Sequence, residues 1–310
     1  MMVIEDRQIN LLWQKIFNDL PSQYWPSSTL YVVATPIGNL ADMSARALYC
    51  LQLVDRIACE DTRSSKALLN SWGIDTPLMA AHQHNEMQAA QQIIQGLAQG
   101  ERIALISDAG APAVSDPGGR LVREVRAAGY EVRPLPGPSA VITALMGSGV
   151  TSDENPAFCF AGFVPSKSTA RQNWLKQWGQ HEMPIVMFES PHRLLSSIED
   201  MLSVFGAERQ LTVARELSKR FEQIVSLPLG QVRAWLEADE HRQKGEFVLI
   251  LAAKPEESRD AAEQSLDNYL FTMLRLISLK DSVKLAVQFT GLSRDTVYAR
   301  ALEIKQALEE

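Results

Sequence analysis

Between residues 30 and 254 the chain alternates short apolar segments with longer amphipathic ones. The apolar segments at residues 30–34, 56–59 and 102–107 are rich in β-forming residues and stop abruptly at Gly, Pro or acidic side chains. Segments with helical spacing, such as residues 45–53 and 86–98, separate them. This alternation predicts an α/β architecture built mainly on parallel strands.

The pattern restarts after residues 136–149, with strand candidates such as residues 158–163. We therefore expect two α/β domains, over residues 29–138 and 139–254, that pack closely because no linker separates them. Beyond Arg209 one gap between strand candidates is too short for a crossover helix, which predicts some antiparallel neighbours there.

Both ends of the chain lie outside this alternation. Residues 1–28 form an N-terminal extension in which residues 1–20 have the spacing of a short amphipathic helix. A polar linker at residues 254–259 precedes a helical appendage over residues 260–310, where a turn separates two apolar stripes as in a helix-turn-helix. The appendage is only mildly basic, so both nucleic-acid contact and simple packing remain open for it.

The overall charge limits how the chain contacts nucleic acid. The formal net charge is −7, whereas phosphate binding usually leaves a basic footprint. Any RNA surface is therefore expected to be local, or shared with a partner or a second subunit. The three cysteines lack metal-binding spacing, and we expect no metal site and a reducing compartment. The sequence has no signal peptide and no membrane-spanning run, which predicts a cytoplasmic protein.

Five loops with Gly, Pro, Asp and Ser follow strand candidates of the first half. In open α/β sheets such loops gather at the carboxyl edge, where ligands bind. Helix capping explains the loop at Asp116-Pro117-Gly118 by itself, but all five together exceed what turns need. Gly-x-Gly-x-x-Gly, phosphate-loop and nucleophile-elbow patterns are absent. S-adenosylmethionine is one of several small ligands that suit polar loops around an apolar floor. The five loops are residues 36–38, 60–63, 108–112, 116–119 and 136–139.

The loop motifs together resemble a known family. Thr35-Pro36-Ile37-Gly38-Asn39-Leu40, Glu60-Asp61-Thr62-Arg63, Ser107-Asp108-Ala109-Gly110, Ser115-Asp116-Pro117-Gly118 and Pro136-Gly137-Pro138-Ser139 are similar to motifs of the tetrapyrrole-methylase-like superfamily. Within it, Phe188-Glu189-Ser190-Pro191-His192-Arg193, Ala214-Arg215-Glu216-Leu217-Ser218-Lys219 and Lys244-Gly245-Glu246 resemble the ribosomal small-subunit RNA methyltransferase I branch. The resemblance runs from Leu30 to Ala307.

This resemblance implies two α/β domains of the tetrapyrrole methylase type, with S-adenosylmethionine in the cleft between them. It implies a homodimer that methylates the ribose 2′-oxygen of a decoding-centre cytidine in 16S rRNA, within the 30S subunit. At one position the chain departs from the family's Asp-Ala-Gly-Thr-Pro, because Ala111 replaces the Thr and its hydroxyl contact is lost. The expected cofactor contacts are Pro36, Asp108, Gly110, Ala113, Ser139, Ala140, Phe163 and Ala214.

A ribose hydroxyl is a very weak acid, so a base or a group that stabilises the developing alkoxide should assist transfer. The candidates are Glu60, Asp61, Glu189, His192, Glu216 and Lys219. Ion-pair networks and helix caps explain the same side chains equally well. The candidates for RNA phosphate are Arg63, Arg193, Arg215, Lys219, Lys167 and Arg171. Trp174 and Trp178 on the same segment as Lys167 and Arg171 fit either core packing or base stacking.

Two other functions remain open on the sequence. One is methylation of a tetrapyrrole or another small acceptor, which assays on small ribosomal subunits and on porphyrinoids would separate from RNA methylation. The other is a non-catalytic helix-turn-helix regulator that senses S-adenosylmethionine. Specific DNA binding without methyl transfer would support a regulator, although residues 293–304 are less basic than a recognition helix usually is.

Overall fold

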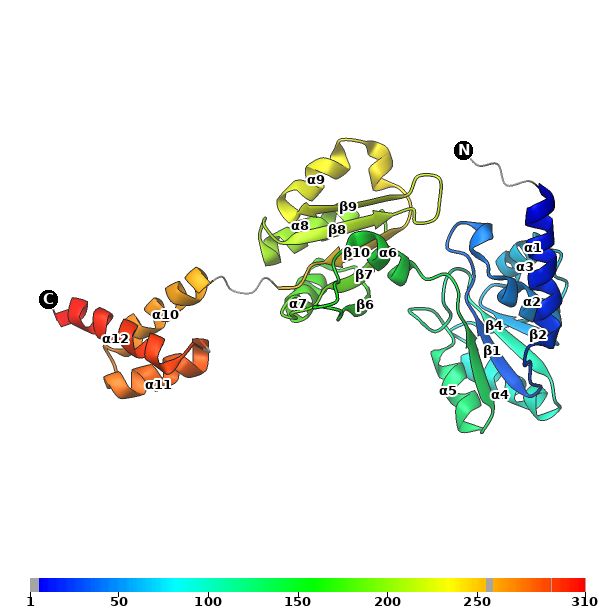
Figure 1. The fold of residues 1–310 in the computed structure, drawn as a ribbon, viewed down its shortest axis with the longest axis horizontal. Coiled ribbons are helices and arrows are strands. Elements are labelled where there is room, and N and C mark those ends of the chain that lie inside the picture. Colours follow the sequence, from blue (N-terminus) through cyan, green and yellow to red (C-terminus); the bar gives the residue numbers. More distant parts are fainter. Residues whose placement is uncertain (1–5, 255–258, 291, 310) are drawn as a thin grey trace. The chain divides into compact units, whose positions relative to one another are not determined.

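The computed structural model describes residues 6–254, 259–290 and 292–309. The chain divides into two compact units, Met1–Ala253 and Lys254–Glu310. The first unit holds two five-stranded sheets and their helices, and the second unit is helical (Figure 1).

The first sheet is entirely parallel, with strand order β3-β2-β4-β1-β5. β1 and β4 are short, largely apolar strands, and a Pro or Asp follows within three residues of each. The parallel sheet predicted for this half is confirmed, and its carboxyl edge collects the loops that follow the strands. The strands are β1 (Thr29–Val33), β2 (Arg56–Cys59), β3 (Leu78–Ala80), β4 (Arg102–Ile106) and β5 (Glu131–Leu135).

Helices cover both faces of this sheet, as expected for parallel strands that are buried on both sides. α2 (Ala45–Leu53) and α3 (Thr62–Asn70) pack on one face, and α4 (Glu86–Ala98) and α5 (Gly119–Ala127) pack on the other (Figure 1). The helical spacing of α2 and α4 predicted their bounds. Outside these layers lie α1 (Asp6–Asp19), η1 (Leu20–Ser22) and η2 (Leu40–Asp42).

Two residues with the side chains of helix caps precede α2 and α4, and they bond differently. Ser44 caps α2, because its hydroxyl accepts a hydrogen bond from the backbone amide of Ala47. Asn85 occupies the N-cap position of α4, but its side chain does not cap that helix. Its amide group instead closes the preceding turn, accepting from the His82 amide and donating to the Ala80 carbonyl.

The second sheet is mixed, with strand order β6-β7-β10-β8-β9. Only β6 and β7 pair in parallel, and every other neighbouring pair is antiparallel. Antiparallel neighbours after Arg209 were expected, but β10 also separates β7 from β8 as an antiparallel strand. The strands are β6 (Cys159–Phe163), β7 (Ile185–Glu189), β8 (Gln210–Arg215), β9 (Gln223–Pro228) and β10 (Phe247–Leu251).

Helices also cover both faces of the second sheet. α6 (Ala140–Ser148) packs on one face, and three helices pack on the other. Trp174 and Trp178 pack against the core beneath these three helices, which favours packing over base stacking for both side chains. The three helices are α7 (Ser168–Trp178), α8 (Leu194–Phe205) and α9 (Leu229–Glu237), and the short η3 (Glu240–Gln243) follows them.

The C-terminal unit consists of α10 (Arg259–Met273), α11 (Leu279–Thr290) and α12 (Arg294–Glu309). Its core contains Leu270 of α10, Val283 of α11 and Val297 of α12. The apolar stripes predicted for the helix-turn-helix are thus the surfaces by which α11 and α12 pack together. Residue 291 of the predicted turn lies outside the described residues.

Within the described ranges, no helix combines the length and apolar character that crossing a membrane requires. The same residues contain no group of three or more His, Cys, Asp or Glu side chains placed to hold a metal ion.

Candidate active site

A cavity of about 410 Å³ opens at the carboxyl edge of the first sheet and is also lined by residues of the second sheet and its loops. Four of the five predicted loops line it, through Ile37, Asp108, Asp116 and Ser139. The fifth loop, residues 60–63, lies beside it, because the next residue along the chain, Ser64, donates from its hydroxyl to Asp108 Oδ1 at 3.0 Å. The expectation that these loops share one edge is confirmed.

The loops after β1 and β4 are joined by backbone hydrogen bonds. The Thr35 amide donates to the Gly110 carbonyl at 2.9 Å, and the Gly110 amide donates to the Thr35 carbonyl at 3.0 Å. Gly110 has φ +80°, a conformation that glycine adopts without the strain a side chain would introduce. This pairing fixes the Asp108–Ala111 stretch along the cavity wall, where Ala111 offers no hydroxyl.

The lining suits a ligand that has a cationic part and an apolar part. Val141, Phe188 and Val248 contribute apolar surface, whereas Asp108 and Glu246 contribute carboxylates. S-adenosylmethionine carries a sulfonium and an ammonium that carboxylates stabilise, and an adenine that apolar surface covers. The volume also falls in the usual range of small-molecule sites, roughly 300–1,000 Å³.

The residues expected to contact the cofactor lie in or beside this cavity. Ala113 lies in a turn with φ +67°, and its amide donates to the Pro117 carbonyl. Pro36 precedes the lining residue Ile37, and Ala214 is buried in the apolar cluster that includes Leu217 of the lining. The expected residues that line the cavity directly are Asp108, Gly110, Ser139, Ala140 and Phe163.

The turn that carries Asp116 is held from another helix. Glu86, buried at the start of α4, accepts hydrogen bonds at Oε1 from the backbone amides of Gly118, Arg120 and Leu121, at 3.0, 2.9 and 3.1 Å. The expected capping of α5 by Asp116 is therefore wrong. Glu86 supplies the acceptor, which leaves the carboxyl group of Asp116 free to face the cavity.

Asp116 has an unusual electrostatic environment. Burial, reinforced by the negative charges of Glu60 and Asp108, raises its pKa from 3.8 to about 6. The sequence placed Asp116 in one of the five loops and indicated a helix cap for it, but gave it no role of its own, and it did not point to Glu86 because an acidic residue at a helix start is ordinary. No sequence pattern links Glu86 to the α5 amides.

Glu216 and Lys219 form a second polar group with Glu246. Lys219 Nζ donates to Glu216 Oε1 at 2.9 Å and to Glu246 Oε2 at 2.8 Å. Burial alone would raise the pKa of Glu216, but hydrogen bonds from Lys219 and the Glu246 amide hold it below its ordinary value. Burial would lower the pKa of Lys219, whereas its bonds to both carboxylates raise it.

This group also contacts the loop after β1. A Cβ placed on Gly38 would lie 2.5 Å from Lys219 Cγ, so the backbone there must be glycine for the lysine to keep its place. The Ser218 hydroxyl donates to Asp42 in the same region. Because Glu246 lines the cavity, the network connects β8 and β10 to the cavity wall.

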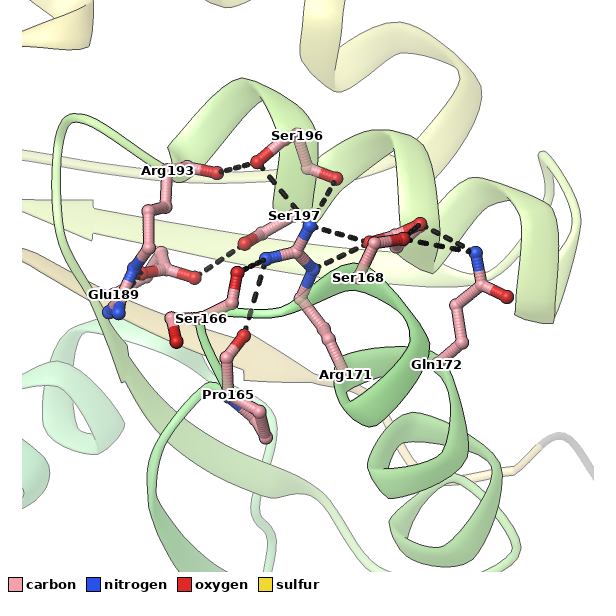
Figure 2. A network of polar contacts seen from close by, with 10 residues as sticks. Pro165, Ser166, Ser168, Arg171, Gln172, Glu189, Arg193, Ser196 and Ser197 are labelled. Carbon is pink, nitrogen blue, oxygen red and sulfur yellow. Dashed lines mark hydrogen bonds and ion pairs between the residues drawn. The ribbon is translucent and has the colours of Figure 1, made fainter.

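Glu189 lies at the cavity wall with its carboxylate fully engaged (Figure 2). Its Oε1 accepts from the Ser190 amide at 2.6 Å and from Arg193 Nε at 2.9 Å, and its Oε2 accepts from the Ser197 hydroxyl at 2.5 Å. These bonds tie the end of β7 to the start of α8. Glu189 therefore orients the Ser190–Arg193 turn, and both of its carboxylate oxygens already have partners inside the protein.

Arg171 requires a revision of its expected role. Its side chain is only 3% exposed, and its guanidinium donates to Asp200, to the Pro165 and Ser166 carbonyls and to Ser196 (Figure 2). With its donors engaged inside the protein, Arg171 anchors α7 to α8 and is not placed to bind an RNA phosphate.

Arg215 is similar. It is 6% exposed, and it donates to the carbonyls of Phe221, His241 and Lys244 and to the Gln223 side chain. Its role is to hold the segments around β8, again instead of the expected phosphate contact. Both arginines were assigned from charge alone, and charge does not distinguish a buried guanidinium from an exposed one.

The remaining candidates lie around the first sheet and on α7. Asp61 is the N-cap of α3 and accepts from the Arg63 amide at 2.8 Å. Arg63 and Lys167 are exposed, as is His192 beside Arg193. Glu60 lines a second cavity next to the first.

Comparison with known proteins identifies the relatives of this chain. Residues 29–233 match the family model described as Tetrapyrrole (Corrin/Porphyrin) Methylases, and residues 260–305 match the model described as RsmI C-terminal HTH domain. The chain is 45% identical over 274 residues to ribosomal RNA small subunit methyltransferase I of Escherichia coli O157:H7, covering 88% of this chain and 94% of that relative. It is 44% identical over 279 residues to the protein of the same name from Pseudomonas aeruginosa, covering 89% and 98%.

Solved structures show the same fold at much lower identity. Diphthine synthase aligns with a TM-score of 0.54 and 14% identity, covering 72% of this chain and 89% of that chain. Uroporphyrin-III-C-methyltransferase from Thermus thermophilus aligns with a TM-score of 0.52 and 16% identity, covering 73% and 94%. Together with the two family models and the loop motifs around the cavity, these findings show that the chain belongs to the ribosomal RNA small subunit methyltransferase I family, a tetrapyrrole methylase-fold family that depends on S-adenosylmethionine.

Proposed function

We propose that this protein transfers the methyl group of S-adenosylmethionine to the ribose 2′-hydroxyl of a decoding-centre cytidine in 16S rRNA. The observation that carries the proposal is the pairing, in one chain, of the methylase sheets with the C-terminal module at residues 260–305. The relatives that match most of this chain are named for small-subunit rRNA. We further propose that it acts in the cytoplasm, as a homodimer, on the 30S subunit.

The chemistry of the first cavity supports the cofactor half of the reaction. The bound cofactor supplies an electrophilic methyl group on sulfur, and the protein supplies position and charge. Asp108 accepts a hydrogen bond from the Ser64 hydroxyl and lines the cavity, where its carboxylate can bind a cationic or hydroxyl-bearing part of the cofactor. The apolar surface of Val141 and Val248 shelters its less polar part and keeps water from the reacting atoms.

The polar side chains near the second sheet support a role in orienting the cofactor and the turn at Ser190. Lys219 holds Glu246 at the cavity, and Glu216 holds Lys219. We propose that this group orients the bound cofactor and that Glu189 orients the turn at Ser190. Asp61 caps α3 and acts through the position of that helix.

Substrate RNA requires positive charge on a chain with a net charge of −7. Arg63 and Lys167 are exposed and Arg193 is half-exposed, and we propose that these three contact phosphate. Because these three side chains do not offset the overall negative charge, a second copy of the chain and the ribosomal particle itself are expected to complete the RNA-binding surface.

The test is transfer of radiolabelled methyl from S-adenosylmethionine to unmodified 30S subunits, naked rRNA, total DNA and a porphyrinoid. Nuclease digestion then locates the label on ribose or base. Label on one cytidine ribose of the 30S subunit is the expected result. Label on a base, or on the porphyrinoid alone, would overturn the proposal in favour of another acceptor.

A further inference from the structure

A second cavity, of about 600 Å³, adjoins the first one. Its walls come from the loop after β2, the loop before α4, and the first turn of α5. Unlike the first cavity, it is lined mainly by polar side chains, among them Glu60, Gln83, Arg120 and Arg123. The lining combines the carboxyl groups of Glu60, Glu86 and Asp116 with the two arginines, so it suits a polar ligand that offers both hydroxyl donors and negative charge.

The two cavities share a wall. Ser115 and Asp116 line both of them. A ligand in the second cavity therefore reaches a ligand in the first across these two residues. Ser115 has φ +58°, and the turn is held in this shape by the bonds from Glu86 to the start of α5.

Two arginines on α5 give the second cavity its positive charge. Arg120 and Arg123 are one turn apart, so their side chains project from the same side of the helix. Both are exposed, and neither guanidinium makes a hydrogen bond or ion pair in the part of the chain that the structure describes. The backbone amides at the start of α5 are already occupied by Glu86. An anion would thus be bound by the arginine side chains and not by the helix terminus.

Resting on the proposed function, we infer that the second cavity holds the acceptor nucleotide. Arg120 and Arg123 bind the phosphates that flank it, and Asp116 accepts the hydrogen of its 2′-hydroxyl at the wall shared with the cofactor. Guanidinium groups suit phosphate oxygens because they donate in a planar fork. Asp116 is then a catalytic residue, since it touches the reacting hydroxyl.

The step balances without any further reactant. The 2′-oxygen forms a bond to the methyl carbon while the carbon–sulfur bond breaks, and that bonding pair stays on sulfur. The hydroxyl proton passes to the carboxylate of Asp116, from which it is lost to water after the product leaves. A carboxyl group whose pKa is near 6 is ionised at neutral pH and is a better proton acceptor than an ordinary aspartate.

The first test uses the double variant Arg120→Gln/Arg123→Gln, with Arg126→Gln on the same helix as its control. We expect KM for 30S subunits to rise about 100-fold, about tenfold for each charged contact, with the affinity for S-adenosylmethionine unchanged. We also measure the slope of the logarithm of the RNA association constant against the logarithm of the salt concentration. We expect this slope to become shallower by about 1.4, about 0.7 for each lost phosphate contact. A purely structural role of the arginines would not change that slope. Arg126 lies outside the lining, so its variant should behave as wild type.

The second test compares Asp116→Asn with Asp108→Asn. Asp116→Asn should lower kcat about 100-fold or more. It should also abolish the fall in kcat that protonation of Asp116 causes in the wild-type protein below about pH 6. Asp108→Asn should chiefly raise KM for the cofactor. If Asp116→Asn only raises KM for the cofactor, or if the double arginine variant keeps the wild-type KM and salt slope, the inference is wrong although the proposed function stands. If the wild-type protein labels no ribose of the 30S subunit, the proposed function fails and the inference fails with it.

Discussion

Glu86 and Gly118 lie 32 positions apart in the chain, and the carboxylate of Glu86 accepts the backbone N–H of Gly118 at 3.0 Å. The same oxygen accepts from Arg120 and Leu121, so one buried side chain satisfies the free amides of α5 and locks that helix to α4. Because Glu86 takes these amides, Asp116, which precedes the start of α5, does not cap the helix. Freed from capping, it lies between the two cavities.

Replacement of Glu86 by Ala should therefore destabilise the protein strongly. The change leaves the buried amides of Gly118 and Leu121 without their acceptor, and each such group costs about 1–3 kcal/mol. We expect the free energy of unfolding to fall by about 2–4 kcal/mol, measured by urea denaturation. Glu124→Ala, on the exposed side of α5, is the control and should change it by less than about 0.5 kcal/mol. Equal effects of the two variants would show that the Glu86 bonds contribute little.

The raised pKa of Asp116 predicts how its replacement changes stability with pH. In the folded protein the pKa is about 6, against an ordinary value of 3.8, so the folded state binds the proton more tightly. This group therefore lowers stability as pH rises from about 4 to above 6. The full difference corresponds to ~3 kcal/mol, and partial contact with water reduces it.

Asp116→Asn removes the unfavourable charge. We expect the variant to be more stable than wild type by about 1–2 kcal/mol at pH 8 and equally stable near pH 4, while its methyl transfer is impaired. Urea denaturation at the two pH values measures this difference. Equal stability of variant and wild type at pH 8 would contradict the raised pKa.

Lys219 should matter for cofactor affinity. Its ammonium bridges Glu216 and Glu246, and Glu246 lines the first cavity. Lys219→Met leaves two carboxylates facing each other, so Glu246 should move and the Kd for S-adenosylmethionine should rise about tenfold. Titration calorimetry measures the Kd. The matched control is Lys244→Met, because Lys244 forms an exposed pair with Glu240 at 3.4 Å, and its Kd should equal that of wild type. We expect Lys219→Arg to recover part of the affinity for S-adenosylmethionine. An unchanged Kd in Lys219→Met would refute the role of Lys219 in cofactor binding.

Arg171 should matter for stability and not for RNA. Arg171→Met leaves the carboxylate of Asp200 buried without its partner, which should lower the free energy of unfolding by about 3–5 kcal/mol. KM of the folded fraction for 30S subunits should stay the same. Arg63→Gln is the opposite case, since Arg63 is exposed, and it should raise KM about tenfold with stability unchanged. Denaturation curves and methyl-transfer kinetics on both variants decide the matter. A raised KM in Arg171→Met would restore its assignment to RNA.

Much of the fold was predictable because the signals are local. A run such as β2 (Arg56–Cys59) has a strand pattern that ends at an acidic turn, and the helical spacing of α2 marks its bounds. The position of β10 between β7 and β8 was not predictable, because pairing depends on which apolar edges meet in space. Likewise Asn85 has the sequence of a helix cap, yet its side chain bonds to the turn before α4, where His82 and Ala80 offer nearer partners.

Some features of the site were likewise predictable from local sequence, whereas others depend on how the chain packs. The order of residues along the chain puts Gly, Pro and Asp after several strands, and parallel pairing brings those loops to one edge around Asp108. Which charged side chains stay exposed to solvent depends on how distant segments pack together. Arg171 and Arg63 are the same residue type, but burial against Asp200 engages the first, whereas solvent surrounds the second. Charge is a property of one residue, whereas burial and hydrogen-bond partners come from segments far apart in the chain, and these decide whether a guanidinium holds the fold or binds a ligand.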